Sequence, residues 1–73
     1  MDKRELERVQ AYMRRIFQNT TIRVVPRPRK TDSAEVYIGE EFVGVLFLDD
    51  EDGDHSYNFQ MAILEQDLDE AAN

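Results

Sequence analysis

Apolar residues recur at three- and four-residue spacing in the first part of the chain. This spacing places five of them on one face of a helix over about residues 3–18: Leu6, Val9, Met13, Ile16 and Phe17. Asp2 and Glu5 have the spacing of a capping box, in which each side chain accepts a hydrogen bond from the other residue's backbone N–H. The pattern therefore predicts an amphipathic helix that begins just after Asp2.

Short runs of β-branched and aromatic residues follow the helix. They predict strands over about residues 21–25, 34–38, 42–48 and 56–64. Pro26 has no N–H to donate to a ladder, so the first strand either ends at Val25 or lies at an edge of the sheet. Residues 27–32 are expected to form a polar loop. Gly39 opens a loop of two or three residues before the next strand, and these two lengths place opposite side chains on each face.

The last predicted strand alternates between apolar and polar positions, but its end is ambiguous. Its apolar positions share one face: Tyr57, Phe59, Met61 and Ile63. Residues from Met61 onward are also good helix formers, so a helix that begins at Met61 competes with a strand that continues to Leu64. Residues 66–73 form an acidic tail, in which we expect one helical turn near Leu68.

These elements predict one α+β domain over residues 1–73, with an N-terminal amphipathic helix packed on a three- or four-stranded antiparallel β-meander. Since one helix covers only one sheet face, the third strand, which is apolar on both sides, exposes its second face. Depending on the register, that face carries Phe42, Leu46 and Leu48, or it carries Val43, Val45 and Phe47. We take the second set as the candidate self-association surface. The alternative is that residues 26–30 or the C-terminal tail fold back over it.

Length and charge sharpen this expectation. Seventy-three residues without cysteine form a marginal core, and domains of this size often gain stability by oligomerising. No apolar run approaches the length of a membrane span, and the charged N-terminus does not resemble a signal peptide, so we expect a cytoplasmic protein. All nine bases lie between Lys3 and Lys30, so residues 1–30 have a net charge of +6, while residues 31–73 carry thirteen acids and no base.

The bases form a candidate partner surface. At 100° per residue, three of them share one stripe of the helix opposite its apolar face, and three more follow in the loop: Arg4, Arg8, Arg15, Arg27, Arg29 and Lys30. Such a surface suits an acidic protein partner. RNA is the alternative partner, although the acidic part of so small a protein would repel a polyanion.

The sequence contains no motif of a catalytic, calcium-binding or phosphate-binding site. His55 stands beside Asp54 without a cysteine or a serine motif that could serve as nucleophile. The acidic turn at residues 49–54, with Asp52 and Gly53 at its tip, lacks the glycine and glutamate spacing of a calcium-binding EF-hand loop. The three glycines are too far apart to hold a phosphate. We therefore expect no enzyme, no catalytic residue, no metal site and no cofactor.

The stretch from Thr21 to Leu46, with the acidic turn and the segment from Ser56 to Leu64, resembles a family of small alphaproteobacterial proteins known only as a domain of unknown function. The resemblance extends from the helix to Leu68 and implies a bacterial cytoplasmic origin, without an activity or a functional residue. The sequence thus predicts a non-enzymatic interaction module that forms a homodimer through its exposed sheet face. RNA binding by the basic surface is the second hypothesis.

Overall fold

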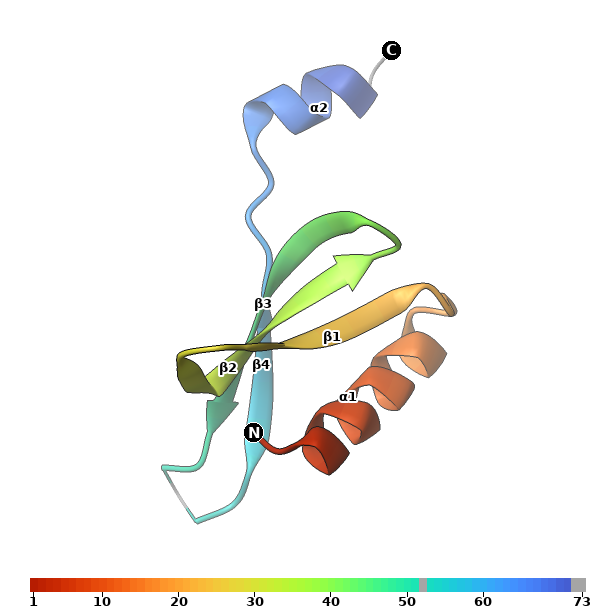
Figure 1. The fold of residues 1–73 in the computed structure, drawn as a ribbon. Coiled ribbons are helices and arrows are strands. Elements are labelled where there is room, and N and C mark those ends of the chain that lie inside the picture. The colour runs from red at the N-terminus through yellow and green to blue at the C-terminus, as the bar shows by residue number, and fades with distance from the viewer. Residues whose placement is uncertain (52, 72–73) are drawn as a thin grey trace.

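The computed structural model describes residues 1–51 and 53–71 of the chain. One helix lies on a four-stranded antiparallel sheet whose spatial order is β1-β2-β3-β4, as predicted for an α+β meander, and a second helix follows β4 at a distance from the sheet (Figure 1). In chain order the elements are α1 (Lys3–Ile16), β1 (Ile22–Arg27), β2 (Lys30–Ile38), β3 (Glu41–Asp49), β4 (Ser56–Gln60) and α2 (Glu65–Ala71). Predictions that fall on Asp52 and on residues 72–73 lie outside the described residues.

Helix α1 begins where the sequence predicts and ends two residues earlier. The capping box is present, because Asp2 Oδ1 accepts from the Glu5 backbone N–H at 2.7 Å and Glu5 Oε1 accepts from the Asp2 N–H at 3.3 Å. Phe17 caps the helix, and Gln18 adopts a φ of 51°, in the left-handed region that interrupts helical geometry. The apolar stripe extends through Phe17, which is why the pattern placed the end at residue 18.

The β1–β2 hairpin is longer than predicted. Arg27 pairs with Lys30, so only Pro28 and Arg29 remain as the connection and the polar loop expected at residues 27–32 is wrong. Pairing with β1 overrides the polar composition of the start of β2, because backbone hydrogen bonds do not depend on side-chain polarity. The edge-strand alternative for Pro26 is confirmed, since β1 lies at the edge of the sheet and continues past the proline.

The end of β4 differs from both sequence-based alternatives. The strand stops at Gln60 rather than at Leu64, and the following helix begins at Glu65 rather than at Met61. The last ladder pair joins Gln60 to Val45, next to a β-bulge in β3. A bulge bends its strand and can end pairing. Residues 61–64 are consequently extended without being part of the sheet. The helical turn expected near Leu68 lies within α2.

The register assigns the two faces of the sheet. We call the face toward α1 the inner face and the opposite one the outer face. The buried core lies between α1 and the inner face, and its hydrophobic members are Leu6, Met13, Ile22, Val24, Ala34, Val36 and Leu46. The β2–β3 turn has two residues, Gly39 and Glu40, which settles the loop length left open by the sequence.

The bulge makes Val43 an extra residue in β3. Val36 pairs with Gly44 and Tyr37 pairs with Phe42, so Val43 has no partner of its own in β2. Val43 packs against the inner-face core, whereas the sequence analysis placed it on the outer face with Val45. That assignment of Val43 is wrong, because a bulge shifts the alternation of side chains by one residue.

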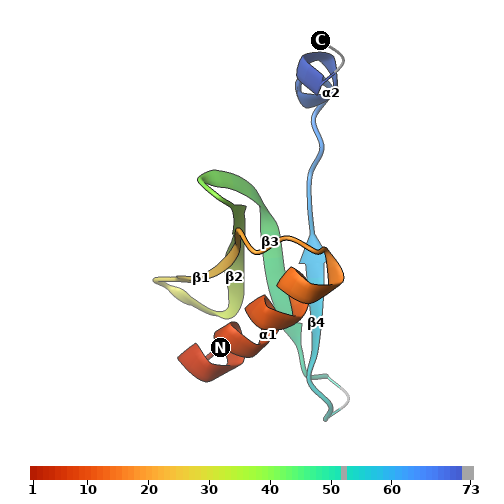
Figure 2. The ribbon, with the colours of Figure 1, turned by 90° about the vertical axis from the view of Figure 1, so that its right-hand side faces the viewer.

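Helix α1 crosses the twisted sheet obliquely (Figure 2), and its backbone lies closest to β1. On the side of β4, Phe59 packs over Gly44. A Cβ built on Gly44 would lie 2.4 Å from the Gln60 carbonyl oxygen and 2.7 Å from Cε1 of Phe59. The glycine in mid-strand is therefore what allows β4 to approach β3 this closely.

We expect Gly44→Ala to lower the free energy of unfolding by about 1–3 kcal/mol, because the added methyl group overpacks the β3–β4 contact. In hydrogen exchange followed by mass spectrometry, this variant should exchange faster than wild type, and the increase should be larger in β4 than in β2. Gly39→Ala is the matched control: its Cβ meets nothing within 4 Å, although its φ of 61° strains any other residue. Equal protection of β4 in the two variants would contradict the close packing at Gly44.

Candidate functional site

An apolar groove runs between α1 and the β4 side of the inner face. It has a volume of about 750 Å³. Its helix wall includes Tyr12, Ile16 and Phe17, which are 55%, 50% and 56% exposed. Its sheet wall includes Tyr57 and Phe59. The groove exists because α1 packs closest to β1 and leaves this part of the inner face uncovered.

A second hollow of about 330 Å³ continues the groove toward the β2–β3 turn. The two share Met13, Phe17 and Phe59, so they form one continuous depression, and we use the name groove for both hollows together. The second hollow is lined further by Ile38 and Met61, which are also partly exposed. Apolar side chains thus line most of an open surface on the inner face.

Polar groups gather at one end of the groove. The Tyr57 hydroxyl donates a hydrogen bond to Oε2 of Glu5, and Nδ1 of His55 lies 3.6 Å from the same oxygen. This hydrogen bond lowers the pKa of Glu5 below its ordinary value and raises the pKa of Tyr57 to about 12. It also joins the first turn of α1 to β4 across 52 positions of sequence. His55 contacts Glu5 and makes no hydrogen bond to Asp54 among the described residues.

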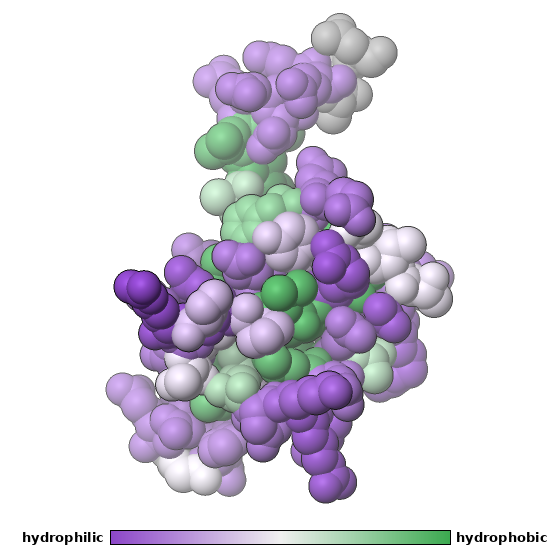
Figure 3. Space-filling view, viewed as in Figure 1, coloured by the Kyte–Doolittle hydropathy of each residue, from purple (hydrophilic) through white to green (hydrophobic). Residues whose placement is uncertain are grey.

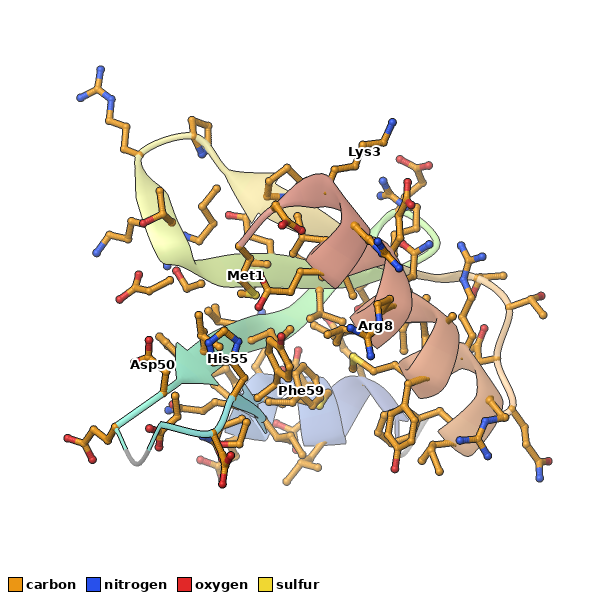
Figure 4. All side chains as sticks on the ribbon, turned by 90° about the horizontal axis from the view of Figure 1, so that it is seen from below. Met1, Lys3, Arg8, Asp50, His55 and Phe59 are labelled. Atoms are coloured by element: carbon orange, nitrogen blue, oxygen red, sulfur yellow. The ribbon has the colours of Figure 1, made fainter. Side chains whose placement is uncertain are left out.

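The predicted basic residues do not form one continuous surface. Arg8 lines the groove, and the guanidinium of Arg15 lies 5.2 Å from the ring centroid of Tyr12 on the same wall. Figure 4 shows the groove residues Arg8, His55 and Phe59 near one another, whereas Lys3 points away from them. The other candidates are elsewhere: Arg4 is exposed near the start of α1, Arg27 donates to Oγ of Ser33 at 3.1 Å, and Arg29 and Lys30 are exposed at the β1–β2 turn.

The outer face carries two of the three residues predicted for self-association. Val45 and Phe47 lie there, and Phe42 takes the place of Val43. Part of this face is already covered by its own contacts. The Arg23 guanidinium lies 4.9 Å from the ring centroid of Tyr37, and Phe42 meets the same ring edge-on at 5.6 Å.

Sequence reasoning missed the groove. It identified the helix stripe but left out Tyr12, which borders that stripe, and it took Phe59 for a core residue beneath the helix. The available signal was the width of the helix's apolar arc, since a stripe that includes Tyr12 extends beyond what one contact with a sheet buries. Which strands the helix covers was not readable, because local patterns do not fix the position of a helix over a sheet.

Neither a metal cluster nor a membrane-spanning helix is present in the described residues. Within residues 1–51 and 53–71, no three His, Asp or Glu side chains are arranged to hold a metal ion. No helix in this part of the chain is long and apolar enough to cross a membrane.

The fold and the groove define a small α+β domain, in which one helix lies on a four-stranded antiparallel meander and leaves part of it open. The sequence profile of a family described as "Protein of unknown function (DUF3126)" matches residues 5–67, and the chain belongs to this family. This agrees with the resemblance drawn from the sequence. No curated protein and no solved structure matches the chain.

Removing the Tyr57 hydroxyl should change how stability depends on pH. Glu5 accepts the hydrogen bond as a carboxylate. The stabilisation of the fold by ionised Glu5 is therefore present above the ordinary pKa of 4.5, and it is lost as the pH falls through the lower pKa of Glu5 in the folded state. Tyr57 donates only when protonated, so its stabilisation is complete below pH 10 and is lost between pH 10 and about 12. Wild type should therefore be more stable than Tyr57→Phe at neutral pH, with the difference vanishing at both extremes.

Chemical unfolding followed by circular dichroism at a series of pH values measures this difference. Tyr12→Phe is the control, because the Tyr12 hydroxyl makes no hydrogen bond within the described part of the chain and its loss should leave the pH profile unchanged. A stability difference between wild type and Tyr57→Phe that persists unchanged above pH 12 would refute the role of this hydrogen bond.

Proposed function

We propose that the protein is a small non-enzymatic interaction module that associates with a second copy of itself through the groove. One observation carries the proposal: α1 leaves the β4 side of the inner face open, and large apolar side chains remain exposed there. Exposed contiguous apolar surface on a soluble protein is typical of an interaction site. Tyr12, Phe17 and Phe59 are of the aromatic kind enriched in interface cores.

The polar end of the groove supports a non-enzymatic role. An efficient acid or base catalyst has a pKa near the working pH. The hydrogen bond between Tyr57 and Glu5 moves both groups in the opposite sense, since it keeps Glu5 ionised and Tyr57 protonated over a wide pH range. Both groups are thus suited to fastening α1 to β4, and neither is suited to moving a proton at neutral pH.

The groove is a better association surface than the outer face favoured by the sequence. On the outer face, Tyr37 contacts two charged side chains. Arg23 stacks on its ring, and its hydroxyl donates a hydrogen bond to Glu35 at 3.0 Å. A partner that packed there would have to desolvate these charged groups. The groove is lined mostly by apolar side chains, and its charged lining residues are Glu5, which already accepts a hydrogen bond from Tyr57, and Arg8.

RNA binding is not favoured by a specific contact. Arg8 and Arg15 stand at the groove, Arg27 is engaged with Ser33, and Arg29 lies at the β1–β2 turn. A phosphate backbone is gripped by bases that follow one track. The dispersed arrangement fits better with Arg8 and Arg15 forming a positive rim around an apolar binding surface.

Ile16→Glu tests the groove as the association surface. A charge on this exposed position should raise the dissociation constant of the dimer at least about tenfold, because it prevents burial of the apolar wall. Ala11→Glu is the matched control, as it adds the same charge to an exposed position of α1 outside the groove. Phe47→Glu places the charge on the outer face and should leave the dimer intact.

Sedimentation velocity at micromolar concentrations measures all four proteins. Wild type and the Ala11 and Phe47 variants should sediment as dimers, and the Ile16 variant as a monomer. A wild type that stays monomeric at every concentration would rule out self-association. A dimer that Phe47→Glu breaks and Ile16→Glu leaves intact would instead assign the contact to the outer face.

A further inference from the structure

We infer that the groove of each copy receives the C-terminal arm of the other copy, in a reciprocal exchange. The C-terminal arm is defined here as residues 61–71, which comprise the extended segment after β4 and helix α2. The inference rests on the proposed self-association and names the segment that fills the groove. It follows from four properties of the arm: its isolation, the area it leaves exposed, its charge and its direction.

Past Met61, which lines the second hollow, the arm stands away from the rest of the described chain. Figures 1 and 2 show α2 standing apart from the sheet and from α1 in two perpendicular views. Its apolar residues are exposed, with Ile63 at 62%, Leu64 at 58% and Leu68 at 58%. In Figure 3 the segment that leads to α2 is a hydrophobic band between two mainly hydrophilic regions. Leu64 and Leu68 are four residues apart, so they lie on one side of the helical turn.

Helix α2 needs a partner to be stable. It has seven residues, whereas isolated helices shorter than about 12–15 residues are marginal in water. Asp67 caps its start by accepting from the Leu64 backbone N–H at 3.1 Å, but one cap satisfies only one of the free amide groups of the first turn. Packing of the leucine side against an apolar surface is the usual source of the remaining stability.

The single chain exposes more surface than a compact protein of its mass. A compact monomer of 8.6 kDa exposes about 4,700 Å², and this chain exposes 6002 Å². The radius of gyration is 13.5 Å, against about 11 Å for a compact domain of this length. The surplus of about 1,300 Å² is of the size that one partner contributes to a stable interface, about 800 Å² or more.

The charges of the arm and of the groove wall are complementary. Helix α2 contains four acids and no base, while α1 contains five bases and two acids. Arg8 and Arg15 stand at the groove, where they would face the acidic side of a helix whose leucines point inward. Opposite charges at the rim of an interface favour encounter and fix orientation.

The direction of the arm favours a second copy over its own chain. Met61 follows β4 directly, and α2 begins only at Glu65, so a return into the chain's own groove requires a reversal within residues 61–64. This segment shows neither turn nor bend. Its sequence, Met-Ala-Ile-Leu, contains none of the residues that favour turns, namely Gly, Pro, Asn, Asp and Ser. The arm therefore projects outward to where another molecule can receive it.

Leu68→Asp in the full chain tests the arm. The substitution should raise the dissociation constant of the dimer at least about tenfold, because a charge replaces a leucine that arm exchange buries in the partner's groove. Gln66→Asp is the matched control, since it adds the same charge to α2 without removing an apolar group, and it should change the constant less than about threefold. Both positions are exposed in the single chain, so neither variant removes a core contact.

Crosslinking identifies what the arm contacts. The chain has no cysteine, so Ile16→Cys in one preparation and Leu68→Cys in another give each protein a single thiol. After mixing and treatment with a short bismaleimide, we expect the Ile16–Leu68 heterodimer to exceed both homodimers. The double variant Ile16→Cys, Leu68→Cys should give intermolecular crosslinks, seen as a covalent dimer on a denaturing gel.

The outcomes separate the two proposals. A wild-type monomer without crosslinked dimer would overturn both self-association and arm exchange. A wild-type dimer that Leu68→Asp leaves intact, with Ile16–Ile16 crosslinks dominant, would overturn arm exchange alone and leave a groove-to-groove dimer. An internal crosslink in the monomeric double variant would show that the arm folds back into its own groove, and would overturn exchange with a second copy.

Discussion

One short helix has to cover a four-stranded sheet, and most other features of the fold depend on this mismatch. Fourteen residues give a helix about 21 Å long and about 10 Å wide, whereas four strands span about 14 Å between the outer strand axes and more with their side chains. Because the sheet is twisted, a helix that packs close to β1 moves away from β4. The buried core is therefore small, and an apolar groove remains on the β4 side.

Two local features of β3 position the walls of this groove. Gly44 lets the Phe59 ring and the Gln60 carbonyl approach the strand, and the adjacent bulge turns Val43 toward the inner face. The hydrogen bond from Tyr57 to Glu5 then fixes the distance between α1 and β4 at one end. The groove is thus held open by specific contacts on both walls, which is a requirement for a surface that receives a partner without rearrangement.

The elements that local chemistry determines could be predicted from the sequence. The capping box at Asp2 and the edge position of Pro26 each follow from local residue chemistry. The start of β2, the side of Val43 and the end of β4 depend on pairing with another strand. The local sequence around each of them therefore does not predict these features. The groove depends on where α1 lies over the sheet, which is a property of the whole fold.

The separation of charge along the chain has a physical consequence for association. Each copy carries a net charge of −7, so two copies repel one another unless the contact joins regions of opposite sign. A two-fold contact through the outer face brings the same surface of both copies together. An exchange of arms is also two-fold, but it brings the acidic α2 of each copy to the basic α1 of the other, twice. Of the two arrangements, only arm exchange places opposite charges of the two copies against each other. Because salt screens this attraction, the arm-exchanged dimer should weaken as salt is added.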